Sequence, residues 1–317
     1  MVRYIRREQR IIRTLLLTNL ITLVLLVLTI LLAIALPLQK KDTGLTIDGQ
    51  LAMELADDYE VSVGYLQELF PDYLVYQDGA EYIFLPQDGS LPHNELDASL
   101  LSWVGDRAVY SQDGKTALTG VDVSVYQGKI DWEAVAADGI DFAMIRLAYR
   151  GYGSGSLMVD EYAEINLAGA TAAGLDIGAY IFSQATTVEE ALEEADLVIN
   201  MLKDYDVTYP VVFDMEEIHE EEARVDNLTI AQRTEITDAF CKAIKKEGYT
   251  PMIYGNTRWL AGRLDLRQLK DYDIWYAQYY HTFQFPYAFT MWQYTDSGTV
   301  AGIEGEVDLN LCFKTYK

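Results

Sequence analysis

The chain has 317 residues, half of them hydrophobic, which suits one large domain with an accessory segment or two small domains. Its formal net charge of −25 argues against nucleic-acid binding, because such a chain offers no basic stripe to neutralise phosphates. With three histidines in the whole sequence, a zinc site is also disfavoured, and we expect no metal or other cofactor.

The N-terminus combines a basic head with a long apolar stretch. Residues 1–41 hold seven lysines and arginines against one glutamate, a net charge of +6, so the rest of the chain carries −31. Within this head, Leu15–Leu36 contains no charged residue, and 22 helical residues span about 33 Å, enough for a bilayer core. We therefore expect a signal anchor over residues 15–37 that crosses the cell membrane once.

Orientation follows from the five arginines that precede the apolar stretch, which predict a cytoplasmic tail over residues 1–14 and an extracytoplasmic body that faces the cell wall. A cleaved signal peptide is the alternative, because Ala33-Ile34-Ala35 offers a small-x-small cleavage site. Either interpretation exports the body of the protein.

Residues 38–117 form a membrane-proximal segment rich in Asp, Gly and Tyr. The pattern predicts one or two short helices within Gln50–Phe70. It also predicts a hairpin of Tyr73–Tyr76 and Tyr82–Leu85 around an Asp-Gly turn. The segment is either a small domain or an ordered stalk.

Residues 118–317 alternate apolar strand-like runs with helical patterns, which implies a parallel sheet in an α/β fold. Eight strands are predicted: Val121–Val125, Phe142–Leu147, Ile177–Phe182, Val211–Phe213, Pro251–Tyr254, Ile274–Ala277, Phe289–Gln293 and Val307–Leu311. Five helices are predicted: Trp132–Ala137, Asp160–Ala173, Thr187–Leu202, Ile230–Lys246 and Trp259–Leu269. Eight strands suggest closure into an irregular, TIM-like barrel without its final helices. Cys241 and Cys312 are expected to be buried free thiols.

Four acidic residues fall at the ends of these strands. Asp214 and Glu216 close the run Tyr209–Glu216, and side chains at i and i+2 of a strand share a face, about 6.5–7 Å apart at the Cα. Asp122 lies on the first strand and Asp308 on the eighth, which barrel closure makes neighbours. Because barrel chemistry sits at the C-terminal strand ends, we expect the four carboxylates in one mouth.

Three interpretations fit four clustered carboxylates. Glycoside hydrolysis needs one protonated carboxyl group and one carboxylate, and crowded acids separate their pKa values by repulsion. A Mg²⁺ or Ca²⁺ site uses the same side chains, although the sequence has no Asp-x-Asp-x-Asp loop. Solvated acids without a function are the third interpretation. Aromatic residues able to contact sugars favour the first: Tyr126, Tyr180, Tyr254, Trp275, Tyr276, Trp292 and Tyr294.

Three motifs surround the acids. They are Gly120–Gly128 (GVDVSVYQG) followed by Ile130-Asp131-Trp132, then Tyr209–Glu217 (YPVVFDMEE), and finally Met291–Tyr294 (MWQY) followed by Gly305–Asn310 (GEVDLN). In this order they resemble the glycoside hydrolase family 25 lysozymes, over about Gly120 to Phe313. One such motif would be weak evidence, but the set is specific.

The resemblance implies a flattened barrel of eight strands and five helices. It also implies hydrolysis of the β-1,4 bond between N-acetylmuramic acid and N-acetylglucosamine in the glycan strands of peptidoglycan. Glu216 would be the general acid, and Asp214 would assist the sugar's N-acetyl group or stabilise the charged intermediate. Asp122 and Asp308 would complete the acidic floor. The spacing of Asp214 and Glu216 fits an inverting pair better than a retaining pair, but a route assisted by the substrate's acetamido group leaves the stereochemistry open.

Candidate substrate contacts are Tyr180, Tyr254, Tyr276, Trp292, Gln293 and Arg146, although each aromatic side chain suits the barrel core equally well. The sequence departs from the family pattern at Ile181, where many members have histidine, and at Arg146–Gly151, which replaces a Lys-Ala-Thr-Glu-Gly pattern. Arg146 either sets the protonation of a nearby acid or is paired structurally. A non-catalytic, membrane-anchored peptidoglycan-binding protein on the same barrel is the alternative function.

Overall fold

The computed structural model describes residues 62–218 and 222–316. The cytoplasmic tail and the signal anchor that the sequence predicts lie outside these residues. Within the described ranges, no helix is both long and apolar enough to cross a bilayer.

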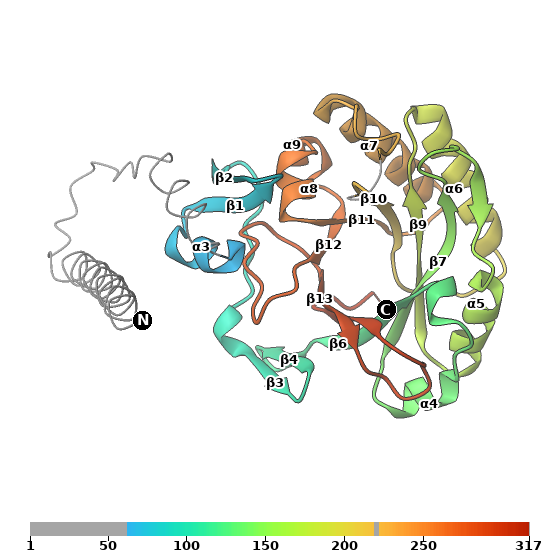
Figure 1. Cartoon of the computed structure of the whole chain (residues 1–317). Helices are drawn as coiled ribbons and strands as arrows, with labels where there is room; N and C mark the ends of the chain where they lie inside the picture. Colours follow the sequence, from blue (N-terminus) through green and yellow to red (C-terminus); the bar gives the residue numbers. More distant parts are fainter. Residues whose placement is uncertain (1–61, 219–221, 317) are drawn as a thin grey trace, which may run out of the picture. The chain divides into compact units, whose positions relative to one another are not determined.

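Eight strands close into a barrel, as the sequence predicts (Figure 1). They are β6 (Leu118–Val123), β7 (Phe142–Arg150), β9 (Asp176–Ser183), β10 (Val211–Met215), β11 (Pro251–Asn256), β12 (Asp273–Ala277), β13 (Met291–Gly298) and β14 (Val307–Cys312). Each is paired with the next along the chain, and β6 closes the ring by pairing with both β7 and β14. A short strand, β8 (Leu157–Val159), adds to β7.

The eighth strand differs from the expected parallel sheet. Strand β14 runs antiparallel to both β13 and β6, whereas the barrel pairs among the other seven strands are parallel. The connection from Gly298 to Val307 contains no helix, and a parallel pairing needs a longer crossover connection. A short loop between β13 and β14 therefore reverses the chain direction.

Helices cover one side of the barrel. They are α4 (Trp132–Ala137), α5 (Ala163–Ala172), α6 (Val188–Leu202), α7 (Ile230–Lys246), α8 (Thr257–Gly262) and α9 (Leu266–Leu269). The single helix expected over Trp259–Leu269 is thus two short helices, because Asp265 caps α9 with its side chain and interrupts the first helix. The four earlier helices are confirmed.

Residues 62–117 contribute small elements that pack on the barrel. They are α3 (Val63–Leu69), β1 (Tyr73–Asp78), β2 (Glu81–Pro86), the 3-10 turn Ala98–Leu100, β3 (Leu101–Val104), β4 (Arg107–Gln112) and β5 (Lys115–Thr116). Strands β1 and β2 form the predicted hairpin, with Gly79 at a positive φ of 62° in its turn. The three-stranded sheet of β3, β4 and β5 is not anticipated by the sequence analysis.

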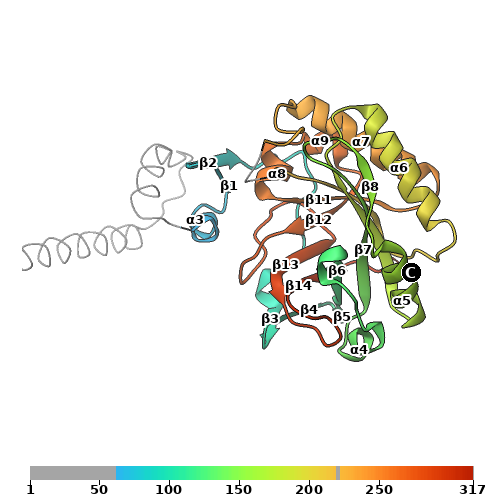
Figure 2. The same cartoon turned by 45° about the vertical axis from the view of Figure 1, so that its right-hand side comes forward.

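These N-terminal elements lie where the barrel lacks helices (Figures 1 and 2). Tyr110 of β4 packs edge-on against Phe283 and Phe313, beside the last strands of the barrel. Arg107 forms an ion pair with Asp138 and donates to the carbonyl oxygen of Thr299. The N-terminal elements therefore take over the covering role that the missing final helices have in a regular α/β barrel.

The buried side chains form two layers. An inner cluster fills the barrel and includes Phe142, Met144, Val212, Met252 and Trp275. A larger outer cluster lies between the strands and the elements that cover them. Neighbouring residues of a strand alternate between these layers, because successive side chains point to opposite faces. Both cysteines are buried free thiols, as expected.

Candidate active site

A cavity of about 620 Å³ contains all four predicted acids: Asp122, Asp214, Glu216 and Asp308. Asp122 lies near the C-terminal end of β6, and Asp214 and Glu216 lie at the end of β10. Asp308 lies near the start of β14, and because this strand is antiparallel, its start meets the C-terminal ends of the other strands. The volume is typical of small-molecule sites.

Asp122 and Asp308 form the floor of the cavity as a directly opposed cross-strand pair. Gln293 Nε2 donates to both oxygens of Asp122 at 3.0 and 3.1 Å, and Asn310 Nδ2 donates to Oδ1 at 2.7 Å. Burial and the charge of Asp122 raise the pKa of Asp308 to about 10, so Asp308 is protonated at neutral pH and hydrogen-bonded to Asp122. Burial raises the pKa of Asp122, and these hydrogen bonds oppose that rise.

Asp214 and Glu216 are surrounded differently. Asp214 is 6% exposed, and its Oδ1 has no hydrogen-bond partner within the described residues. Burial raises the pKa of Asp214, the charges of Glu216 and Asp122 raise it further, and Arg146 opposes the rise. Burial and the charge of Asp122 raise the pKa of Glu216 to about 7. Near neutral pH, Glu216 can therefore both hold and release a proton.

A relay of hydrogen bonds fixes the donors of the floor. Gln293 Oε1 accepts from the hydroxyl groups of Tyr254 at 2.8 Å and Tyr279 at 3.0 Å, which orients the Gln293 amide toward Asp122. Trp275 Nε1 donates to Asn310 Oδ1 at 2.8 Å and orients that amide in the same way. The assignment of oxygen and nitrogen in both amides follows from these partners.

Four of the predicted substrate contacts line the cavity: Tyr180, Tyr254, Gln293 and Arg146. The other two are core residues. Tyr276 is 0% exposed, stacks on Phe285 and shares a hydrogen bond with Thr257. Trp292 is 0% exposed and donates to the carbonyl oxygen of Gln278. Both belong to the outer layer, so the prediction that they contact substrate is corrected to a packing role.

Arg146 combines the two roles that the sequence leaves open. Its Nε lies 2.8 Å from Oδ2 of the buried Asp160, so it is paired structurally. Its guanidinium group also lies over the rings of Tyr126 and Tyr149, 5.1 and 5.4 Å from their centres, at the cavity wall. From there its charge lowers the pKa of Asp214 against the larger effects that raise it.

Ile181, which stands where the resemblance described above leads us to expect histidine, does not line the cavity. Its side chain is 0% exposed and belongs to the outer layer, next to Tyr180 on the inner face. The departure from the family pattern at this position therefore changes the packing behind the cavity and leaves the acids untouched.

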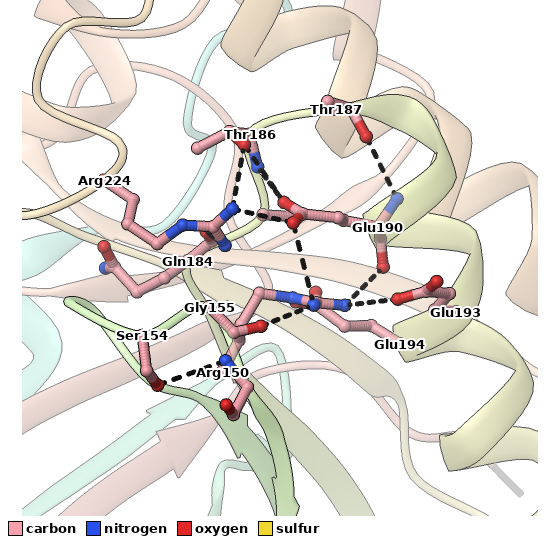
Figure 3. A network of polar contacts seen from close by, with 12 residues as sticks. Arg150, Ser154, Gly155, Gln184, Thr186, Thr187, Glu190, Glu193, Glu194 and Arg224 are labelled. Atoms are coloured by element: carbon pink, nitrogen blue, oxygen red, sulfur yellow. Dashed lines mark hydrogen bonds and ion pairs between the residues drawn. The ribbon is translucent and has the colours of Figure 1, made fainter.

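A buried ion-pair network holds the rim beside β7 (Figure 3). Arg150 is 3% exposed, pairs with Glu194 at 2.6 Å and donates to the carbonyl oxygen of Gly155 at 2.9 Å. Arg224 joins the network through Glu190 at 2.7 Å. Burial raises the pKa of Glu194 to about 7. The network holds the turn after β7 against α6, and this turn brings Tyr152 to the cavity.

Two participants in the site, Asn310 and Tyr279, are absent from the sequence-based candidates, and Trp275 is named there only as an aromatic residue able to contact sugars. Asn310 stands two residues after Asp308, so the strand period places both on one face and could have identified it. Trp275 follows from the same rule once Tyr276 is known to face outward. Tyr279 lies in an irregular loop after β12 that carries no periodic pattern.

The chain is similar in sequence to bacterial proteins. The uncharacterized protein YegX of Escherichia coli is 28% identical over 196 residues, covering 61% of this chain and 68% of YegX. Lysozyme M1 of Streptomyces globisporus is 27% identical over 206 residues, covering 62% of this chain and 67% of the lysozyme.

The modular autolysin LytC of Streptococcus pneumoniae, solved with a synthetic peptidoglycan ligand, has the same fold, with a TM-score of 0.56 at 22% identity. That alignment covers 67% of this chain and 51% of LytC, so the chain spans about half of LytC. Residues 121–303, more than half of the chain, match the glycosyl hydrolases family 25. This chain therefore belongs to that family.

Proposed function

We propose that the protein is a muramidase, which hydrolyses the β-1,4 bond between N-acetylmuramic acid and N-acetylglucosamine in peptidoglycan. Glu216 is the general acid. It gives its proton to the glycosidic oxygen while the bond from that oxygen to the anomeric carbon of muramic acid breaks. Water then supplies the hydroxyl group of the new reducing end, and the proton that water loses returns to the acidic cluster.

Asp214 acts on the sugar that develops positive charge. Its buried Oδ1, which has no partner among the described side chains, is available to the N-acetyl group of muramic acid or to the developing charge itself. Asp122 adds negative charge to the floor of the cavity, and its proton-sharing partner Asp308 limits the total charge. Tyr180, Tyr254, Gln293 and Arg146 contact the glycan from the walls.

One observation carries the proposal: Glu216 lies in one cavity with three other buried or half-buried carboxyl groups, and burial and the charge of Asp122 raise its pKa to about 7. A general acid works best when its pKa lies near the working pH. A buried cluster of like charges lowers the stability of the fold. A site that only binds sugar gains nothing from this cost, whereas a general acid needs the raised pKa that the cluster produces.

We also propose that the protein acts from the outer face of the cell membrane. The uncharged stretch Leu15–Leu36 and the arginines before it support a single-pass anchor with a cytoplasmic N-terminus. The anchor then keeps the barrel close to the wall and raises its local concentration at the glycan strands. Accessibility of an introduced cysteine in the barrel to a membrane-impermeant thiol reagent in whole cells tests this orientation.

The enzymatic test is mass spectrometry of purified peptidoglycan digested by the full chain. New reducing ends on muramic acid are expected, and new ends on glucosamine would contradict the bond assignment. Glu216→Gln is expected to abolish turnover, whereas Glu164→Gln, an exposed position on α5, keeps it.

The same assay separates the alternatives. A non-catalytic peptidoglycan-binding protein would bind the polymer and produce no new ends with the wild-type chain. A hydrolase that depends on a hard metal ion would lose its activity in EDTA, which the proposed mechanism does not predict.

A further inference from the structure

A second cavity, of about 610 Å³, continues from the first past the general acid. Glu216, Tyr254 and Tyr279 line both cavities. One wall of the second cavity comes from β11, α8 and the loop after β12. The opposite wall comes from the N-terminal elements: Ser62, Val63, Gly64, Tyr76 and Gln77. These five residues lie outside the part of the chain that matches the family, residues 121–303.

The N-terminal wall is held in place at α3. The carbonyl oxygen of Gly64 accepts from Gln284 Nε2 at 2.9 Å, and the hydroxyl group of Tyr280 donates to Glu68 at 3.1 Å. A Cβ atom on Gly64 would lie 2.6 Å from the ring of Tyr280, so glycine is required for this close approach. The helix α3 is therefore fixed against the loop that carries Tyr279.

The β1–β2 hairpin is fixed at the other end of the wall. Asp78 pairs with Arg258 at 2.8 Å and accepts two hydrogen bonds from Arg263 at 2.9 Å. Both arginines also pair with Glu217, the residue after the general acid. One ion-pair network thus joins the β1–β2 hairpin to the loop that carries Glu216. This network fixes the position of the N-terminal wall relative to the general acid.

The acids indicate which part of the substrate occupies the second cavity. Asp122, Asp214 and Asp308 line only the first cavity, where the positively charged glycosyl unit develops. The general acid must lie between that unit and the departing sugar, because it protonates the oxygen that joins them. With Glu216 at the junction, the second cavity lies on the leaving-group side.

The chemistry of the second cavity fits a neutral saccharide. Its walls combine the amide groups of Gln77 and Asn256, the hydroxyl group of Thr257 and the rings of Tyr76 and Tyr279. Gln77 is exposed, and no hydrogen bond occupies its amide within the described residues.

The charges in this cavity do not favour an anionic stem peptide. The positive charge of Arg258 is already matched by Asp78 and Glu217. We propose that the N-terminal wall, formed by Ser62, Val63, Gly64, Tyr76 and Gln77, completes a saccharide subsite on the leaving-group side of the groove, with Gln77 as its accessible polar contact. This inference rests on the proposed muramidase function and assigns the N-terminal segment a direct part in substrate binding.

The test compares the full-length wild type with Gln77→Ala, which removes the amide, and Gln77→Trp, which fills the cavity at an exposed strand position. The substrates are peptide-free alternating oligosaccharides of N-acetylglucosamine and N-acetylmuramic acid, from the tetrasaccharide upward. Tyr65→Ala, on the exposed face of α3 and away from both cavities, is the matched control.

For the longer oligosaccharides, both Gln77 variants are expected to lose about three- to tenfold in kcat/KM, mainly through KM, as expected for one or two lost polar contacts. The tetrasaccharide also places its departing sugars on this side of Glu216, so its kcat/KM is expected to fall as well, and the preferred cleavage position is expected to move along the longer chains. Equal kinetics for wild type and variants at every length would overturn the subsite. A difference confined to strands that carry stem peptides would overturn it in favour of peptide binding.

Failure of the proposed function gives a different result. In that case the wild type and Tyr65→Ala would both fail to cleave any of the oligosaccharides. Calorimetric titration of Glu216→Gln with the longest oligosaccharide then still reports the subsite: weaker binding when Gln77→Ala is added supports it, and unchanged binding overturns it.

Discussion

The two carboxyl pairs line the same cavity, but the protein surrounds them with hydrogen bonds in opposite ways. Asp122 accepts three hydrogen bonds from two amides, and its partner Asp308 keeps a proton, with a pKa of about 10. Asp214 has an unpartnered oxygen within the described residues, and Glu216 has a pKa of about 7. The floor pair is held in one protonation state, whereas the strand-end pair is free to change its state.

This difference teaches how one cavity can hold four acids. Hydrogen bonds to a carboxylate lower its pKa and fix its charge, and burial without such bonds raises the pKa. The floor pair therefore supplies a constant field, and that field is one of the causes of the raised pKa of Glu216. The reaction is therefore carried out by Asp214 and Glu216, whose protonation states can change.

The largest effect is expected for Glu216→Gln, which removes the proton donor of the strand-end pair. A glutamine amide has the shape of the acid but cannot donate a carboxyl proton, so we expect kcat on purified peptidoglycan to fall by about 10²–10⁴-fold. Release of new muramic acid reducing ends measures this. Activity within threefold of wild type would show that another group is the acid.

The second effect is expected for Asp214→Asn, in the same pair. Asparagine cannot carry the negative charge that a carboxyl group can place beside the developing cation, so kcat is expected to fall by about 10²-fold with a smaller change in KM, because the interaction matters mainly in the transition state. Steady-state kinetics on soluble glycan fragments measure the changes in kcat and KM separately. A change in KM alone would assign Asp214 to binding.

The pH profile probes the link between the two pairs. Since Glu216 must be protonated to act, activity is expected to fall as pH rises through about 7. The charge of Asp122 contributes to this pKa, so Asp122→Asn is expected to move the alkaline limb to lower pH in addition to lowering the rate. An unmoved limb in the profile of kcat/KM would mean that the pairs are not coupled.

The pH dependence of the protein's stability tests the floor pair separately from the strand-end pair. The pKa of Asp308 is about 10 in the fold and ordinary in the unfolded chain, so the native state binds the extra proton and the free energy of unfolding falls as pH rises toward 10. Asp308→Asn removes this titration and offers an amide donor to Asp122. The melting temperature of the variant is therefore expected to depend less on pH between 6 and 9, and an equal dependence would contradict the assignment.

Much of this arrangement could be predicted from the sequence. The eight apolar runs gave the barrel strands, and the period of two placed Asp214 and Glu216 on one face. The same rule, applied further, excludes Trp292 and Tyr276, because their neighbours Gln293 and Trp275 point inward. The direction of β14 and the position of Tyr279 depend on loops, whose course is set by tertiary contacts and not by a local pattern.

The smallest effects concern the relay that orients the floor. Tyr254 and Tyr279 donate to the same oxygen of Gln293, so either one alone can hold the amide toward Asp122. Tyr254→Phe or Tyr279→Phe is expected to lower kcat by about threefold, the scale of one neutral hydrogen bond.

The double variant leaves that buried oxygen unpaired, which loosens the Gln293 amide and weakens its two hydrogen bonds to Asp122. Its loss is then expected to exceed the product of the single losses, reaching tenfold or more, and a double-mutant cycle on kcat measures the excess. Strict additivity would mean that the two hydroxyl groups act on substrate separately. In that case the fixed state of the floor pair would have to come from Asn310 and Trp275 alone.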